Sequence, residues 1–232
     1  MLLAAHQPGY LPSISLFQKM LLADIFVLAA DYQYSTHGAI NRTQIKTVNG
    51  PGWLTVPVLS RKRRGQLIRD VEINTASNWR SKHWKSLEVN YVYSAYFEQF
   101  RDELQRIYSR DWKYLLDVNL ALFDFVRNTL GIATRLRLSS ELGVGGRHCE
   151  RLFNMMSALG CTGYLAGSEL RGYLVPALFE DRGLTLRFLG KSQLCYYQQF
   201  GNFAPDLSVV DLLLNEGGGS RALMLSELQQ AE

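Results

Sequence analysis

The first thirty residues or so constrain the fold more than any other stretch. Residues 2–6, LLAAH, form a short apolar run that predicts a buried strand. After Pro12, SISLFQKMLLA carries apolar residues at roughly helical spacing, and DIFVLAA predicts a second buried strand. Strand, helix and strand at this spacing are typical of a parallel, right-handed βαβ unit. The sequence therefore predicts an α/β fold with a mainly parallel, Rossmann-like sheet.

The second half of the chain repeats this alternation. TRLRLSS, TGYLAGS and LTLRFL predict further strands, and RHCERLFNMMSALG and LVPALFEDRG predict helices between them. The tail FAPDLSVVDLLLNEGGGSRALM predicts a loop, a short helix and a glycine-rich end that frays. The chain as a whole, residues 1–232, is predicted to be a single domain.

Residues from about 41 to 130 interrupt the alternation. QIKTVNGPGWLTVPVL, centred on residues 49–52, predicts a β-hairpin, and LIRDVEI predicts a strand after it. From Asn78 to about Leu130 the pattern is helical and rich in aromatic residues. We therefore expect an antiparallel hairpin excursion followed by a helical, aromatic-rich insertion.

Composition excludes several classes of protein. The hydrophobic fraction of 47% and the charged fraction of 20% are those of a globular protein. No run of about 18 apolar residues predicts a membrane span. The interrupted N-terminal run is not typical of a signal peptide, and three cysteines fit a reduced chain, so a cytoplasmic protein is expected. The net charge of +4 permits an anionic ligand, whereas RKRR is interpreted as a solvated loop and no nucleic-acid partner is expected. The absence of C-x-x-C spacing predicts no metal site.

Polar residues follow the first predicted strand at once. His6 and Gln7 stand where that strand ends, and the next helix is expected to present its N-terminus to the same place. Helix N-terminal N–H groups suit a phosphate or a carboxylate. The alternative is a histidine that only satisfies its hydrogen bonds in a rigid turn, and it stays open.

The second strand is followed by another polar group. Asp31 and Gln33 should emerge beside His6, and a carboxylate near an imidazole favours general acid–base chemistry. His6 and Asp31 are therefore the candidate catalytic residues. Asn41, Arg42 and Lys46 follow; Arg42 offers a fork for an anion, although Arg42 and Lys46 could also be an ordinary solvated face.

A third polar group stands at the end of the strand near residue 138. Ser139, Ser140 and Glu141 could reach into the same crevice, or they could cap the following helix. The chain contains no nucleophile elbow, Walker loop or G-x-G-x-x-G motif. The residues alone therefore predict a polar crevice in an α/β protein without naming its reaction.

Several segments together resemble the WbqC-like protein family. They are HQPGYLPSISLFQKMLLADIFVLAADYQYS, the NR of AINRTQIKT, WLTVPV, LGIATRLRLSSEL, YLAGSELRGYL and YYQQFGNFAPDLSVVDLLLNEG. The resemblance implies a protein of bacterial surface-polysaccharide (O-antigen) gene clusters, among which glycine transferases have been suggested. The residues that fall in its most recognisable segments are His6, Gln7, Tyr10, Gln33, Tyr34, Asn41, Arg42 and Lys46. The chain departs from the family at Ala30, where an acidic residue is usual.

The resemblance leaves three functions to weigh. The first is a transferase or amide-forming enzyme that binds an activated acyl donor at His6, Arg42 and Lys46 and uses an amino-sugar nucleotide as acceptor. The second is a nucleotide-dependent activating enzyme of nucleotidyltransferase-like type. The third is a non-catalytic module that binds a sugar nucleotide. Each of the three functions requires a small-molecule partner, and none of them identifies a cofactor.

Overall fold

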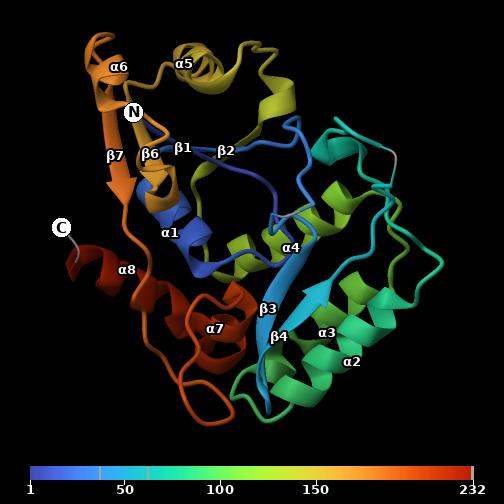
Figure 1. Ribbon diagram of the computed structural model, residues 1–232. Coiled ribbons are helices and arrows are strands. Elements are labelled where there is room, and N and C mark those ends of the chain that lie inside the picture. The colour runs from blue at the N-terminus through green and yellow to red at the C-terminus, as the bar shows by residue number, and fades with distance from the viewer. Residues whose placement is uncertain (37, 62, 231–232) are drawn as a thin grey trace.

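The structure is a computed structural model that describes residues 1–36, 38–61 and 63–230 (Figure 1). Its central sheet has five strands in the order β5-β2-β1-β6-β7, and every neighbouring pair is parallel. The strands are β1 (Leu2–His6), β2 (Ile25–Leu28), β5 (Arg135–Leu138), β6 (Gly163–Gly167) and β7 (Thr185–Leu189). Helix α1 (Ile14–Leu22) connects β1 to β2. The predicted α/β class with a mainly parallel sheet is confirmed.

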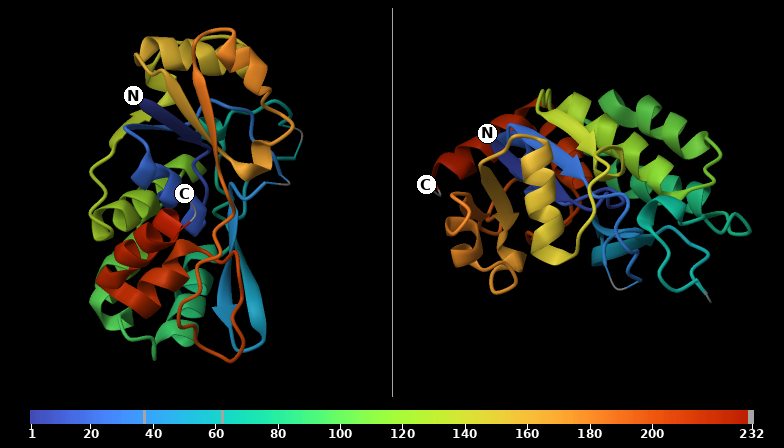
Figure 2. Two further views of the ribbon diagram at one scale, coloured as in Figure 1. Left: turned by 90° about the vertical axis from the view of Figure 1, so that its left-hand side faces the viewer. Right: turned by 90° about the horizontal axis from the view of Figure 1, so that it is seen from above.

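Both faces of the sheet are buried along its central strands, which explains the continuous apolar runs of β1, β2 and β6, whereas the edge strands β5 and β7 are partly exposed. Successive side chains of a strand point to opposite faces, so Leu3 joins one buried cluster and Ala4 the other. Helices α5 (His148–Ala158) and α6 (Pro176–Glu180) cover the face to which Leu3 belongs. Helix α1 and the remaining helices pack on the opposite side of the sheet (Figure 2).

The predicted hairpin consists of β3 (Arg42–Thr47) and β4 (Gly50–Thr55), which pair in antiparallel fashion. Thr47 pairs with Gly50, so the turn lies at residues 48–49, two residues before the middle of the predicted turn at 49–52. Gly50 has φ +94°, a conformation that favours glycine, and it ends the turn. Pro51 therefore lies within β4 of this two-stranded sheet.

The predicted strand at LIRDVEI is wrong. Residues Ile68–Asp70 form a short 3-10 helix, η1, and the segment makes only isolated bridges. Ile68 and Val71 are both fully buried. A spacing of three places both side chains on the core side of a 3-10 turn, whereas a strand would point them to opposite faces.

The aromatic-rich insertion is helical, as predicted. It consists of α2 (Trp79–Tyr91), α3 (Phe97–Ser109) and α4 (Leu115–Thr129). One continuous buried cluster contains Trp79 and Phe97 of the insertion together with Phe26 of the sheet. The insertion and the hairpin thus pack against the sheet through a shared core, on the side opposite α5 (Figure 2).

The prediction that the glycine-rich end frays is wrong. Helix α7 (Val209–Glu216) is followed by a 3-10 turn, η4 (Gly217–Gly219), and by helix α8 (Ser220–Gln230). Met224 is fully buried and anchors α8 on the core. Gly217 has φ +53°, and a Cβ atom there would lie 2.2 Å from Cδ1 of Tyr96. The glycine therefore permits a close approach as well as a tight turn.

Candidate functional site

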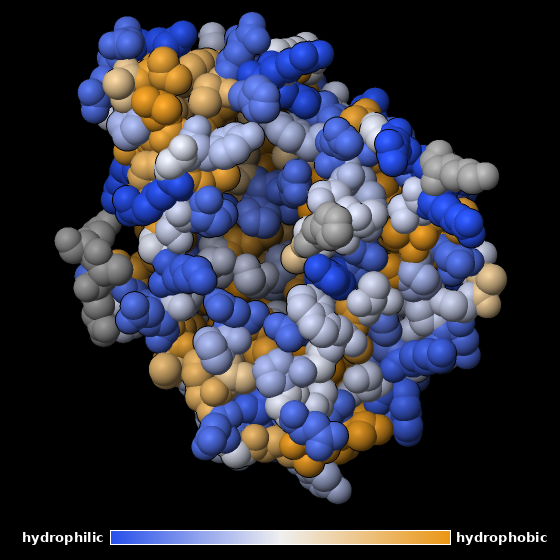
Figure 3. All heavy atoms as spheres, viewed as in Figure 1, coloured by the Kyte–Doolittle hydropathy of each residue, from blue (hydrophilic) through white to orange (hydrophobic). Residues whose placement is uncertain are grey.

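A cavity of about 770 Å³ opens at the carboxyl ends of β1, β2 and β6. Strand β1 lies between β2 and β6, and the strand order runs outward from it in both directions, which is where ligands bind in open α/β sheets. The molecular face of Figure 3 is hollowed near its centre, with hydrophilic residues around the hollow. The charged, imidazole and amide side chains that line the cavity are those of His6, Gln7, Lys19, Asp31, Gln33, Arg147, His148, Arg151 and Glu169.

His6 lies at the end of β1 with a defined tautomer. Its Nδ1 lies 2.8 Å from the carbonyl oxygen of Gln7, and since a carbonyl only accepts, Nδ1 carries the proton. Nε2 is then the unprotonated nitrogen, and it makes no hydrogen bond to the part of the chain that the structure describes. Burial, reinforced by the positive charge of Lys19, lowers the pKa of His6 to about 4. The imidazole is therefore neutral near pH 7 and able to accept a proton.

The carboxylate that acts electrostatically on His6 is that of Glu169, in the turn after β6. The Nζ atom of Lys19 lies 3.9 Å from Oε1 of Glu169. The Lys19 side chain is only 4% exposed, and burial lowers its pKa, whereas the Glu169 side chain is 61% exposed. A buried lysine of α1 thus faces a carboxylate at the cavity wall, with His6 beside both.

Asp31, the carboxylate expected beside His6, is held by other groups. Its Oδ2 accepts a hydrogen bond from Nη2 of Arg151 at 2.5 Å, and its Oδ1 accepts one from the hydroxyl of Ser139. The Arg151 guanidinium also lies 4.4 Å from the centre of the Tyr32 ring. This group joins the ends of β2 and β5 to α5 and forms one wall of the cavity.

The expected position of the α1 N-terminus is not observed. Ser13 and Ser15, at the start of this helix, line a different cavity. The seven residues between β1 and α1 carry the helix start away from His6, and Tyr10 and Leu11 are buried on the way. The helix instead contributes Lys19, from its second turn, to the cavity with His6.

The structure brings together four of the predicted site residues and places the others elsewhere. His6, Gln7, Asp31 and Gln33 line the cavity. Ser139 contacts it only through Asp31, and Ser140 is not among its lining residues. Glu141 accepts a hydrogen bond from the backbone N–H of Leu138 at 3.2 Å, as in the capping alternative.

Three of the residues that follow the first two strands lie in packed surroundings. The Tyr10 hydroxyl contacts Nδ1 of His83 at 2.8 Å and the Tyr108 hydroxyl at 2.5 Å. Asn41 donates to the carbonyl of Val56 at 2.8 Å. Tyr34 is half-buried against the larger core cluster. These side chains stabilise the junction of hairpin, insertion and sheet.

The two basic residues of β3 also lie outside the cavity that contains His6. The Arg42 guanidinium lies 4.8 Å from the centre of the Trp53 ring across the hairpin. Lys46 is 2% exposed, donates to the carbonyl of Asn202 and acts electrostatically on Asp211. Neither residue lines the cavity, so neither can hold an anion next to His6 in this conformation.

Sequence reasoning missed Lys19, Arg151 and Glu169. Glu169 follows the strand TGYLAGS and could have been found by the rule that located His6. Lys19 and Arg151 lie within helices, where a basic residue ordinarily predicts a solvated face. Among the described residues, no group of three histidine, cysteine or acidic side chains is placed to hold a metal ion. No helix in the described part of the chain is long and apolar enough to cross a membrane.

Fold and site together define an α/β protein with a polar cavity at the carboxyl edge of a parallel sheet. The chain belongs to the WbqC-like protein family, whose model matches residues 7–222. It is 32% identical over 216 residues to the uncharacterized protein Rv1507c of Mycobacterium tuberculosis, a match that covers 92% of this chain and 93% of the relative. No solved structure matches the chain.

Proposed function

We propose that the protein is an enzyme that transfers an acyl or aminoacyl group, such as glycyl, to the amine of an amino-sugar nucleotide. The WbqC-like family associates the chain with surface-polysaccharide gene clusters, and the reaction belongs to that setting. The observation that carries the proposal is His6, which has an unprotonated Nε2 and lines a cavity of about 770 Å³. A neutral imidazole at a ligand cavity is the usual proton acceptor for an attacking amine.

The chemistry proceeds in two steps. The amine is bound as its ammonium form, which loses one proton to solvent to give the neutral amine. The neutral nitrogen attacks the acyl carbonyl, a C–N bond forms, and the carbonyl electron pair moves to oxygen. Nε2 of His6 takes the proton that the nitrogen releases, and Lys19 in the same cavity stabilises the oxyanion. The oxyanion then reforms the carbonyl, the bond to the leaving group breaks, and His6 returns its proton to the departing atom. The product is an amide.

Incubation with nucleotide-linked amino sugars and acetyl or glycyl thioesters tests this proposal, with mass spectrometry to detect the amide. We expect kcat/KM, once corrected for the fraction of the sugar amine that is unprotonated at each pH, to stay level down to about pH 5 and to fall near pH 4, because that is the pKa of His6. His6→Gln, which cannot take the proton, should lose the activity. Amide formation that survives His6→Gln with an unchanged pH profile would assign the chemistry to another group.

A second candidate function is nucleotide-dependent activation of a carboxylate. The cavity also carries Arg147, which precedes α5, and His148 and Arg151 of α5, and a cluster of basic groups favours phosphate. This reaction would require ATP and release pyrophosphate. Amide formation from a thioester without ATP would exclude it, whereas pyrophosphate release that depends on a carboxylic acid would favour it over thioester transfer.

A further inference from the structure

A second cavity lies on the other side of Glu169. It measures about 370 Å³ and is bounded by the start of α1 and by residues 191–207, the segment between β7 and α7. Glu169 lines this cavity as well as the larger one that contains His6. One exposed carboxylate therefore stands where the two cavities meet.

The wall of the smaller cavity includes the cation Lys191 and three kinds of group that can contact a sugar. Hydroxyls come from Ser13, Ser15 and Ser192, and carboxylates from Glu169 and Asp206. Aromatic faces come from Tyr196 and Phe203, whose ring centres are 5.5 Å apart at an angle of 87°. Hydroxyls bind a polyhydroxylated ring, aromatic faces pack against its C–H groups, and a carboxylate binds a protonated amine. This is the chemistry of an amino sugar.

Hydrogen bonds hold this wall in place. The Ser192 hydroxyl donates to Oε2 of Glu227 on α8 at 2.8 Å. Gln198 accepts from the backbone N–H of Ala204 at 2.8 Å and donates to its carbonyl at 3.0 Å. The segment thus stays ordered without regular secondary structure, and the cavity is preformed, which lowers the entropic cost of binding.

Space for the Glu169 carboxylate depends on a glycine. A Cβ atom at Gly167 would lie 2.1 Å from Oε2 and 2.2 Å from Oε1 of Glu169. Any other residue at this position would force the Glu169 carboxylate to shift from its present position. Lys19, the basic residue that faces Glu169, is anchored in α1 and buried.

We propose that the smaller cavity is the acceptor subsite, that it binds an amino sugar, and that Glu169 holds the sugar's amine at the junction, facing the donor in the larger cavity. This inference rests on the proposed function and adds the place of the acceptor to it. The donor and its leaving group then occupy the part of the larger cavity that is lined by His6 and Arg147.

Binding of D-glucosamine and D-glucose, followed by NMR titration at pH 6, tests the subsite. The wild-type protein should bind glucosamine about tenfold or more tightly than glucose, because only glucosamine forms the charged hydrogen bond with Glu169. Glu169→Gln should remove most of this preference while glucose binding stays. Gly167→Ala should give the same result by displacing the carboxylate.

Ser15→Phe fills the smaller cavity and should abolish glucosamine binding at the same concentrations. Ser226→Phe, on the exposed face of α8, is the matched control and should bind like the wild type. Equal affinity for the two sugars, no binding of either, or unchanged binding by Ser15→Phe would overturn the subsite.

The two proposals fail separately. If glucosamine binds as described but no amide forms from any donor, the acceptor subsite is supported and the proposed reaction is excluded. If amide forms while Ser15→Phe leaves the KM of the amino-sugar nucleotide unchanged, the proposed reaction is supported and the acceptor subsite is excluded.

Discussion

His6 and His83 have nearly the same acid–base property in two different surroundings. Burial lowers the pKa of each to about 4. Nδ1 of His83 contacts the Tyr10 hydroxyl, and its ring also hydrogen-bonds the backbone of Thr55. His6 uses one ring nitrogen for Gln7, and its other ring nitrogen faces a cavity without a hydrogen-bond partner among the described residues. A shifted pKa therefore does not identify a site; the pairing of both nitrogens and the space beside them do.

The surroundings of the two histidines represent two different regions of the molecule. The region around His83 is packed: its ring lies 5.3 Å from Trp79 and 5.5 Å from Tyr10, centre to centre. The carboxyl edge of the sheet is open and carries charge. Residues that resemble the family's recognisable positions fall into both regions, so they include side chains that stabilise the fold as well as cavity residues.

The largest expected effect separates the two histidines by activity. His6→Gln should reduce kcat by about 10²–10⁴-fold, the usual loss of a general base, with little change in melting temperature. His83→Gln should lower the melting temperature and leave kcat of the folded fraction intact. Both variants are measured by turnover and by thermal unfolding. Equal losses of kcat in the two variants would remove the distinction drawn between them.

The next effect concerns the ion pair that walls the cavity. Asp31→Ala leaves Arg151 without its carboxylate, and the side chains are only 16% and 15% exposed. We expect a loss of about 3 kcal/mol in the free energy of unfolding, because an unpaired charge stays largely buried. Urea denaturation measures it.

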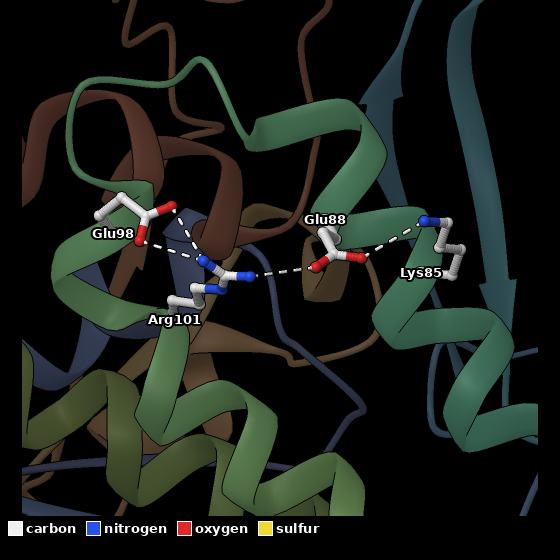
Figure 4. A network of polar contacts seen from close by, with 4 residues as sticks. All are labelled: Lys85, Glu88, Glu98 and Arg101. Atoms are coloured by element: carbon white, nitrogen blue, oxygen red, sulfur yellow. Dashed lines mark hydrogen bonds and ion pairs between the residues drawn. The ribbon is translucent and has the colours of Figure 1, made fainter.

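An exposed network supplies the control for this pair. Arg101 of α3 contacts Glu98 and Glu88, and Glu88 contacts Lys85 (Figure 4). Arg101→Met should cost less than about 1 kcal/mol, since solvent screens exposed ion pairs. If Asp31→Ala cost no more than Arg101→Met, the cavity wall would be flexible and solvated.

A smaller effect concerns acid stability. The folded-state pKa of His83 is about 4 and its ordinary value is 6.5, so the unfolded chain binds more protons between these values. The contribution of neutral His83 to the free energy of unfolding is fully present above pH 6.5 and is lost as the pH falls toward 4. Between pH 7 and pH 5 the loss should be about 2 kcal/mol for this residue. His83→Gln should therefore show a flatter pH dependence of unfolding by urea; an identical slope would mean that His83 is protonated without cost.

The sequence predicted those parts of the structure that depend on short-range pattern. The strands around LLAAH and DIFVLAA followed from apolar runs, and the ends of parallel strands located His6 and Asp31. It could not predict Lys19, because only the tertiary packing of α1 buries that side chain. Nor could the sequence show that Tyr10 is a packing residue whereas His6 lines the cavity. A polar residue in a turn gives the same sequence pattern whether it lines a cavity or hydrogen-bonds a buried partner such as Tyr108.

The smallest expected effect concerns Arg42, which the sequence offered as an anion-binding fork. It lies in the packed region, with its guanidinium 4.8 Å from the ring centre of Trp53, and Trp53 is 56% exposed. Arg42→Lys should cost about 0.5–1 kcal/mol of unfolding free energy, because the planar group stacks on the ring better than an ammonium does. A double-mutant cycle with Trp53→Leu should recover most of this amount as a coupling energy. Ligand binding in the cavity of His6 should be unchanged, since Arg42 does not line it. If Arg42→Lys instead weakened binding of the donor at unchanged stability, the hairpin would move toward the sheet edge when ligand binds, and the two regions would form one site.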